Sequence, residues 1–357
     1  MKKSSIFFLT ILCFLLIGCK SEKEPSLKYP KYWCWIGDRQ GSDWESIIKE
    51  ISDIGITGIL LNGSVESYKK VAPLAEQYGI ELHAWRVIML ANKDVADLHP
   101  EWLSVNKNGV SLADSTAYVP YYRFMCPILP EVRQHIYQRI EDILNIEGVK
   151  GISLDYTRYV DVILPENLWS KYDIIQDKEY PRWDYGYHPA MINAFKDKYR
   201  YNPQLNETTG GDTTWNQFRY DQITEIANEI SRMTREAGKS ISASPFPTPS
   251  IARKLVRQDW DKWELDLVFP MVYNSMYKEE GAEWMAGCID ENVESMKEKG
   301  TELYTGVYVP GHRNTDFNLE KAMNLIEESE SVGFSLYDYF TLTDEEKNTL
   351  KEHIKNH

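Results

Sequence analysis

The feature that most constrains the fold is an alternation, repeated eight times, between short apolar runs and amphipathic segments of helical length. The apolar runs predict buried strands, and the amphipathic segments between them predict helices with one apolar face. Eight strand-then-helix units favour an α/β fold with a single (β/α)8 TIM barrel. A doubly wound open sheet would normally carry a glycine-rich phosphate turn after an early strand, and the sequence has none. The expected strands lie within residues 32–37, 56–62, 80–88, 149–159, 240–245, 265–274, 303–308 and 333–337.

The alternation is interrupted for longest after the fourth expected strand. Residues 161–214 form a polar and aromatic stretch that is rich in Trp, Tyr and Pro, and a shorter interruption follows the third strand. Loops that follow barrel strands gather on the face where barrel enzymes build their sites. We therefore expect a long insertion after strand four to cover that face.

The N-terminus has the pattern of a targeting segment. Lys2 and Lys3 precede an apolar run from Ile6 to Ile17, which is too short for a comfortable membrane span. The run ends at Leu16-Ile17-Gly18-Cys19, which resembles a bacterial lipobox with Cys19 as the lipidated residue. The sequence thus predicts a lipoprotein signal peptide over 1–19, a flexible tether over 20–30 and the barrel over 31–357. We expect an exported protein of the bacterial cell envelope, on its periplasmic or cell-surface face, that meets the membrane only through this lipid anchor.

Composition narrows the range of partners. The net charge of −14 argues against nucleic acid and against an anionic membrane surface. The 23 Tyr and 11 Trp residues are broad apolar rings that suit the faces of sugars, although a large core would also use them. Outside the signal segment, Cys34, Cys126 and Cys288 have neither disulfide-framework nor metal-ligand spacing, and core thiols explain them best.

Candidate functional residues follow from the barrel topology, because a barrel delivers chemistry from the carboxyl ends of its strands. Asp155 ends the apolar run of strand four and is the best candidate for a catalytic group. The partner carboxylate is less well defined: we favour Asp38, after strand one, over Asp161, Asp184 and Asp338. The side chains expected to bind substrate are Trp35, Trp85, Arg86, Tyr156, Arg158, Trp183, Tyr273, Asn274 and Tyr308.

Several other chemistries lack their motifs. The sequence has no HExxH or other metal spacing, no G-x-S-x-G elbow and no phosphate loop, so we expect no metal and no cofactor. Carboxylates beside aromatic rings suit glycoside hydrolysis, in which two carboxyl groups flank the scissile bond. Burial would raise the pKa of Asp155 and Arg158 would lower it, and the sequence leaves the balance open.

Six segments in chain order carry a family resemblance. They begin at His99 (HPEWLSVNKNGVSL), Cys126 (CPILPEVRQHIYQRIEDIL), Val149 (VKGISLDYTRY), Trp215 (WNQFRYDQIT), Ser242 (SASPF) and Gln258 (QDWDKWELDLVFPMVY). Together they resemble glycosyl-hydrolase-like family 10, many of whose members are bacterial lipoproteins with a catalytic (β/α)8 barrel.

The resemblance implies a glycoside hydrolase, with Asp155 as a catalytic residue and Arg158 and Tyr273 in the site. At least one such lipoprotein cuts peptide-free peptidoglycan strands, so that polymer is a candidate substrate here. The chain departs from the family pattern at Lys150, usually Asp, and at Ser153, often His.

A more distant similarity links the fourth strand and the Pro-Met-Val-Tyr-Asn run at 270–274 to chitinase-type barrels, which use the acetamide of the substrate as nucleophile. Those enzymes carry an acid Glu where this chain has Thr157, so acetamide assistance would need a proton donor from another loop. The leading hypothesis is an exported lipoprotein hydrolase of a polysaccharide or glycan strand. The alternatives are a carbohydrate-binding protein on a degenerate barrel, and a lyase that uses Tyr and Arg.

Overall fold

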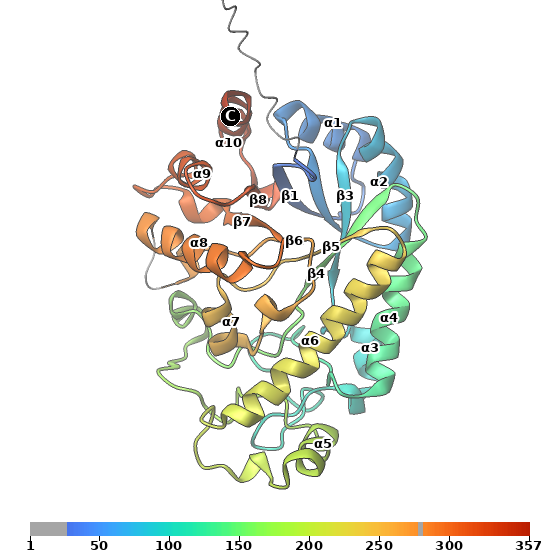
Figure 1. Cartoon of the computed structure of the whole chain (residues 1–357), viewed down its shortest axis with the longest axis vertical. Coiled ribbons are helices and arrows are strands. Elements are labelled where there is room, and N and C mark those ends of the chain that lie inside the picture. The colour runs from blue at the N-terminus through green and yellow to red at the C-terminus, as the bar shows by residue number, and fades with distance from the viewer. Residues whose placement is uncertain (1–26, 278–280) are drawn as a thin grey trace, which may run out of the picture.

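The computed structural model describes residues 27–277 and 281–357. Its eight parallel strands close into one barrel in chain order, β1 to β8, as the sequence predicts, and β1 completes the ring by pairing with β8 (Figure 1). The predicted signal peptide, with Cys19, and most of the predicted tether lie outside the described residues. Within the described residues no helix is both long and apolar enough to cross a bilayer. The strands are β1 (Tyr32–Gly37), β2 (Gly58–Asn62), β3 (Glu81–Val87), β4 (Val149–Asp155), β5 (Ser240–Ala243), β6 (Leu267–Val268), β7 (Glu302–Tyr308) and β8 (Gly333–Tyr337).

A helix follows each strand and packs on the outside of the barrel (Figure 1). Local capping defines where several of these helices begin: Asp43 accepts a hydrogen bond from the Ser46 amide, and Ser64 forms a reciprocal capping box with Ser67. The main helices are α1 (Trp44–Ile54), α2 (Val65–Gln77), α4 (Pro130–Leu144), α6 (Thr213–Glu236), α7 (Pro249–Val256), α8 (Ala282–Met296), α9 (Leu319–Glu327) and α10 (Asp344–Asn356).

The sixth strand is much shorter than the sequence predicts. Regular pairing covers only Leu267 and Val268, whereas the apolar run extends to Asn274. Pro270 has no amide hydrogen to donate to a neighbouring strand, which ends the regular ladder. The backbone still follows the barrel wall, because the Phe269 and Met271 amides donate to the carbonyls of Ala243 and Pro245.

Large side chains fill the interior of the barrel. The indole of Trp33 contacts the ring of Phe269, with ring centroids 5.2 Å apart, and the ring of His83, with centroids 4.9 Å apart. Two glycines make room for these rings: a Cβ at Gly58 would lie 2.3 Å from Trp33, and one at Gly151 would lie 2.5 Å from His83. The interior is therefore a packed core that closes the amino-terminal end, and the carboxyl ends of the strands form the open face.

Two long segments cover this open face, in the lower half of Figure 1. After β3, residues 88–129 contain α3 (Lys93–Leu98) and the 3-10 turn η1 (Pro100–Trp102). After β4, residues 156–212 contain η2 (Glu166–Leu168), η3 (Ser170–Tyr172), α5 (Pro189–Tyr199) and η4 (Pro203–Leu205).

A buried ion cluster holds the second segment to the barrel helices. Asp184 accepts from Arg219 of α6 at 2.5 Å and lies 3.4 Å from Arg257. Arg257 is the C-cap residue that follows α7, and it also pairs with Glu179. The side chains of Asp184 and Arg219 are fully buried. This cluster fixes the position of the loop segment that walls the open face.

Candidate active site at the carboxyl ends of the strands

A cavity of about 260 Å³ opens at the carboxyl ends of the strands. Residues from β1, β3, β4 and β8 line it, together with the loops that follow β3 to β6. Its lining contains two carboxylates, Asp155 and Asp161, and one cation, Arg158. The aromatic residues of the lining are Trp35, Trp85, Tyr118, Tyr121, Tyr122, Tyr156, Tyr172, Phe246, Tyr273, Tyr277 and Tyr337.

Asp155 is the last residue of β4, and its side chain is 7% exposed. The indole N–H of Trp85, on neighbouring β3, donates to Oδ2 at 2.8 Å, and the backbone N–H of Tyr156 donates to Oδ1 at 2.6 Å. Burial raises the pKa of Asp155 to about 6, against the opposing effects of these two donors and of Arg158. About a tenth of Asp155 is therefore protonated at pH 7, far more than of an aspartate with the ordinary pKa, which suits a group that must give and take a proton.

The backbone at Tyr156 holds this arrangement. Its φ of 49° lies in the left-handed region, which a bulky residue rarely adopts. Its own amide reaches back to the Asp155 carboxylate, while its carbonyl accepts from the Met89 amide. Uncommon backbone conformations of this kind gather at functional sites, and this one places the Tyr156 ring in the cavity wall beside Asp155.

The other carboxylate of the cavity has a cationic partner. Oδ2 of Asp161 accepts from Nη1 of Arg158 at 3.0 Å, and both side chains are buried. The guanidinium also lies 5.0 Å from the ring centroid of Tyr156 and 5.1 Å from that of Phe246. Arg158 is thus held by an ion pair and by aromatic faces, and it does not contact Asp155 directly.

Tyr273, in the loop after β6, forms an aromatic group with Tyr308 of β7 and Tyr337 of β8 at one side of the cavity. The ring centroid of Tyr273 lies 5.6 Å from that of Tyr308 and 5.7 Å from that of Tyr337. Tyr337 in turn meets Trp85 edge to face at 6.1 Å. Burial raises the pKa of Tyr337 to about 12, so its phenol stays neutral and can donate a hydrogen bond to a hydroxyl-rich ligand.

The structure brings six of the predicted site residues together around this cavity and leaves five outside it. Those in the lining are Trp35, Trp85, Asp155, Tyr156, Arg158 and Tyr273. Tyr308 lies behind Tyr273 and Tyr337, and Trp183 stacks behind Tyr118, with centroids 6.0 Å apart and planes 9° apart. These two residues support the wall.

Asp38, Arg86 and Asn274 point elsewhere. Asp38 is exposed just beyond β1, and its carboxylate accepts from the Ser67 hydroxyl near the start of α2. Asp38 is not part of the cavity lining and so does not face Asp155 across the cavity. Arg86 donates to the Gly63 carbonyl at 2.9 Å, and Asn274 is buried in the 3-10 turn η6 (Asn274–Met276).

The remaining acidic alternatives have structural partners. Asp184 belongs to the buried ion cluster with Arg219 and Arg257. Asp338 caps the turn after β8 by accepting from the Thr341 amide at 3.2 Å. Of the carboxylates considered as partners for Asp155, Asp161 alone lines the cavity.

Several residues of the cavity wall were not predicted from the sequence. Tyr118, Tyr121 and Tyr122 come from the loop after β3, and Tyr172 and Tyr277 come from the loops after β4 and β6. The run Ala-Tyr-Val-Pro-Tyr-Tyr-Arg-Phe at 117–124 could have indicated these residues. Several aromatic residues close together in a loop over the open face are more typical of ligand binding than of a solvent-exposed loop.

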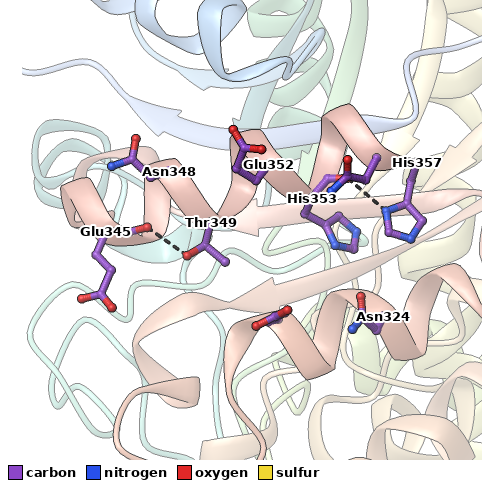
Figure 2. A pocket seen from close by; sticks show the side chains of 9 residues that line it. Asn324, Glu345, Asn348, Thr349, Glu352, His353 and His357 are labelled. Atoms are coloured by element: carbon purple, nitrogen blue, oxygen red, sulfur yellow. Dashed lines mark hydrogen bonds between the residues drawn. The ribbon is translucent and has the colours of Figure 1, made fainter.

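A larger hollow, of about 720 Å³, lies between α9 and α10 on the outside of the barrel (Figure 2). Polar side chains line it, and the rings of His353 and His357 stack with centroids 4.3 Å apart. It has no Trp, Tyr or Phe in its lining, so it is a weaker candidate for a sugar site. Among residues 27–277 and 281–357, no group of three His, Cys, Asp or Glu side chains could hold a metal ion.

The sequence profile of the family described as glycosyl hydrolase-like 10 matches residues 42–315, from α1 to the turn after β7. The chain belongs to this family. The match confirms the resemblance drawn from the sequence motifs, and it includes all the lining residues except Trp35 and Tyr337. No curated protein sequence matches the chain.

Solved structures similar to this glycosyl hydrolase-like 10 chain include several glycosidases. The β-galactosidase of Rahnella sp. R3 has a TM-score of 0.63 at 10% identity, covering 93% of this chain and 56% of that one. The β-galactosidase of Marinomonas ef1 has a TM-score of 0.62 at 12% identity, covering 91% of this chain and 59% of the other. A GH20 exo-β-N-acetylglucosaminidase of Vibrio harveyi has a TM-score of 0.52 at 9% identity, covering 91% and 54%. The chain spans less than three fifths of the length of each, and at these identities the likeness concerns the fold.

Proposed function

We propose that the protein is a glycoside hydrolase that cleaves O-glycosidic bonds in a polysaccharide or glycan strand, with Asp155 as its general acid. The observation that carries the proposal is a buried carboxyl group at a strand end, with its pKa raised to about 6, inside an aromatic-walled cavity. Membership of a glycosyl hydrolase-like family supports it.

In the proposed reaction, the protonated Asp155 gives its proton to the glycosidic oxygen as the bond from that oxygen to the anomeric carbon breaks. In an inverting reaction, water adds to the anomeric carbon and loses its proton to a second carboxylate. In a retaining reaction, that carboxylate first bonds to the anomeric carbon, and the ionised Asp155 then takes the proton of the water that releases the sugar. Asp161 is the carboxylate we propose for this second role, in place of Asp38, because it lies in the same lining. The Trp85 N–H orients Asp155 and stabilises the carboxylate that remains after proton transfer.

One observation favours a second function, non-catalytic carbohydrate binding on a degenerate barrel. Arg158 already pairs with Asp161, which leaves Asp155 as the cavity carboxylate without a direct ion pair. With Asp161 engaged by Arg158, a single available carboxyl group is not enough for two-carboxylate hydrolysis.

We also propose that the barrel is exported and lipid-anchored at Cys19 in a bacterial cell envelope, which makes peptidoglycan strands a candidate substrate. The basic start, the short apolar run and the cysteine in register support this location. Radiolabelled palmitate incorporation into the wild-type chain, and its loss in Cys19→Ala, would test the anchor.

The activity test uses the chain from residue 20 onward against purified peptidoglycan strands and a panel of neutral polysaccharides and aryl glycosides, galactosides and N-acetylglucosaminides included. We expect new reducing ends with the wild type and with the surface control Asp53→Asn, and almost none with Asp155→Asn. Equal turnover by wild type and Asp155→Asn would remove Asp155 from catalysis. Binding of glycans without turnover in any variant would favour the carbohydrate-binding alternative.

A further inference from the structure

A second hollow, of about 580 Å³, adjoins the cavity that contains Asp155. We call it the side hollow. It shares the side chains of Leu164, Pro165 and Tyr277 with the lining of the cavity, so a ligand that leaves the cavity on that side meets it next. A third, more open hollow shares Trp169 with the side hollow and continues outward over η2 and η3.

Aromatic rings line the side hollow where it meets the cavity. Trp284 of α8 stacks on Tyr277, with ring centroids 4.9 Å apart and planes 24° apart, and is partly exposed. Trp169 lies on the loop side of the hollow, and its indole N–H donates to the Leu164 carbonyl at 2.8 Å. A partly exposed ring with a fixed orientation is a ready platform for the apolar face of a pyranose.

The wall between the two spaces is built from specific hydrogen bonds. The Asn167 side chain donates to the Tyr277 carbonyl at 2.6 Å and to the Ser275 carbonyl at 3.2 Å, which ties the loop after β4 to the loop after β6. The buried Gln176 side chain accepts from the Leu164 amide at 2.8 Å and donates to the Tyr118 hydroxyl at 2.7 Å. These hydrogen bonds fix the loops that carry the aromatic rings of the side hollow.

We propose that the side hollow is a second sugar-binding subsite, occupied by the units of a glycan chain that follow the unit held beside Asp155. This inference rests on the proposed function, and it adds where the further units of the glycan bind, between α8 and the loop after β4. The occupant is inferred from the arrangement of the three spaces. The cavity and the side hollow share three lining residues, and the third hollow adjoins the side hollow, so a glycan chain that starts beside Asp155 would extend through them in turn.

The test measures how affinity depends on chain length. Isothermal titration calorimetry would use ladders of N-acetylglucosamine, galactose and glucose oligomers, from monosaccharide to hexasaccharide, with the wild type, Trp284→Ala, Trp284→Phe and Trp169→Ala. The control is Trp102→Ala, since Trp102 is a partly exposed tryptophan outside both spaces. Thermal melting would verify that each variant is folded.

We expect the wild-type affinity to rise with chain length on at least one ladder. Trp284→Ala should weaken binding of the longest oligomer about 3- to 10-fold relative to the monosaccharide, as the loss of one aromatic contact predicts. Trp284→Phe should restore most of this preference, and Trp102→Ala should leave it at the wild-type value.

Two results would overturn the subsite: affinity that does not depend on chain length on every ladder, or a length preference that folded Trp284→Ala and Trp169→Ala both retain. The proposed hydrolysis is tested separately by turnover. Length-dependent binding without turnover would contradict the proposed hydrolysis and support the subsite. Turnover with no length preference would support the hydrolysis and contradict the subsite.

Discussion

Two buried aspartates, 29 positions apart in the chain, have opposite electrostatic surroundings. Asp155 ends β4 and accepts hydrogen bonds from an indole and a backbone amide, with no direct cationic partner, and burial raises its pKa to about 6. Burial pushes the pKa of Asp184 upward as well, but Arg219 and Arg257 outweigh it and hold that pKa below its usual value.

The difference shows how β4 and the loop segment that follows it hold two buried carboxylates, the proposed catalytic group Asp155 and the structural Asp184. A desolvated carboxyl group without a cationic partner destabilises the folded protein when it ionises. Asp155 therefore does not serve stability, and a role in proton transfer would explain its position. A desolvated carboxylate between two guanidinium groups is satisfied. Removing Asp184 leaves the buried Arg219 without a carboxylate partner and Arg257 with Glu179 alone. The predictions below separate these two roles.

The largest contrast should be in catalysis. Asp155→Asn removes the proton that the leaving group needs, and we expect kcat to fall by about 10²- to 10⁴-fold. Asp184→Asn, assayed where it remains folded, should keep kcat within a few-fold of the wild type, since Asp184 is not part of the cavity lining. Similar losses in both variants would contradict the assignment of separate roles.

For stability we expect the opposite order, with the larger loss in Asp184→Asn. Asp184→Asn leaves Arg219 and Arg257 without their shared carboxylate, and we expect the free energy of unfolding to fall by roughly 3–5 kcal/mol. Urea denaturation followed by tryptophan fluorescence would measure it, with the exposed Asp53→Asn as the control for charge loss. An unchanged denaturation midpoint would mean that the cluster does not hold the loop.

Asp155→Asn should instead stabilise the protein at neutral pH. The folded-state pKa of about 6 lies above the ordinary value of 3.8, so the folded chain binds more protons than the unfolded chain between these values. The penalty for ionising Asp155 is therefore absent below about pH 4 and complete above about pH 6, where its removal should gain on the order of 1–3 kcal/mol. The melting temperatures of variant and wild type should converge in acid. A variant that is less stable at pH 8 than at pH 4, relative to the wild type, would contradict the raised pKa.

The smallest effect on activity should come from removing the indole N–H of Trp85, which donates to Asp155. Trp85→Phe removes a hydrogen bond that favours ionised Asp155, so the pKa of the carboxyl group should rise further, by about one unit. If protonated Asp155 is the active form, kcat/KM falls as pH rises through this pKa, and the descending limb should move to higher pH in the variant. A limb that stays in place would assign it to another group.

The sequence alone was sufficient to predict the eight-stranded barrel and the position of Asp155 at its open end. Strand periodicity and turn positions are local properties, and an acid directly after a buried strand occupies the open end of any parallel barrel. The sixth strand shows the limit of this reasoning, because one proline ended regular pairing inside an otherwise continuous apolar run.

Side-chain direction beyond the strand ends was not predictable in the same way. Asp38 follows β1 directly and yet turns toward Ser67, and Trp183 lies one layer behind the wall that Tyr118 forms. Both placements depend on tertiary partners far away in the sequence. Tyr118, Tyr122 and Tyr277 reach the cavity through loops whose paths are set by long-range contacts such as those of Asn167 and Gln176.

The rings of Trp33, Phe269 and Tyr304, packed across the interior, give the barrel a blind end. A polymer cannot pass through a barrel that is closed at one end, so in the proposed reaction both products leave by the open face at which the glycan enters. Release of one product and binding of the next substrate would then use the same opening, which the loops after β3, β4 and β6 frame.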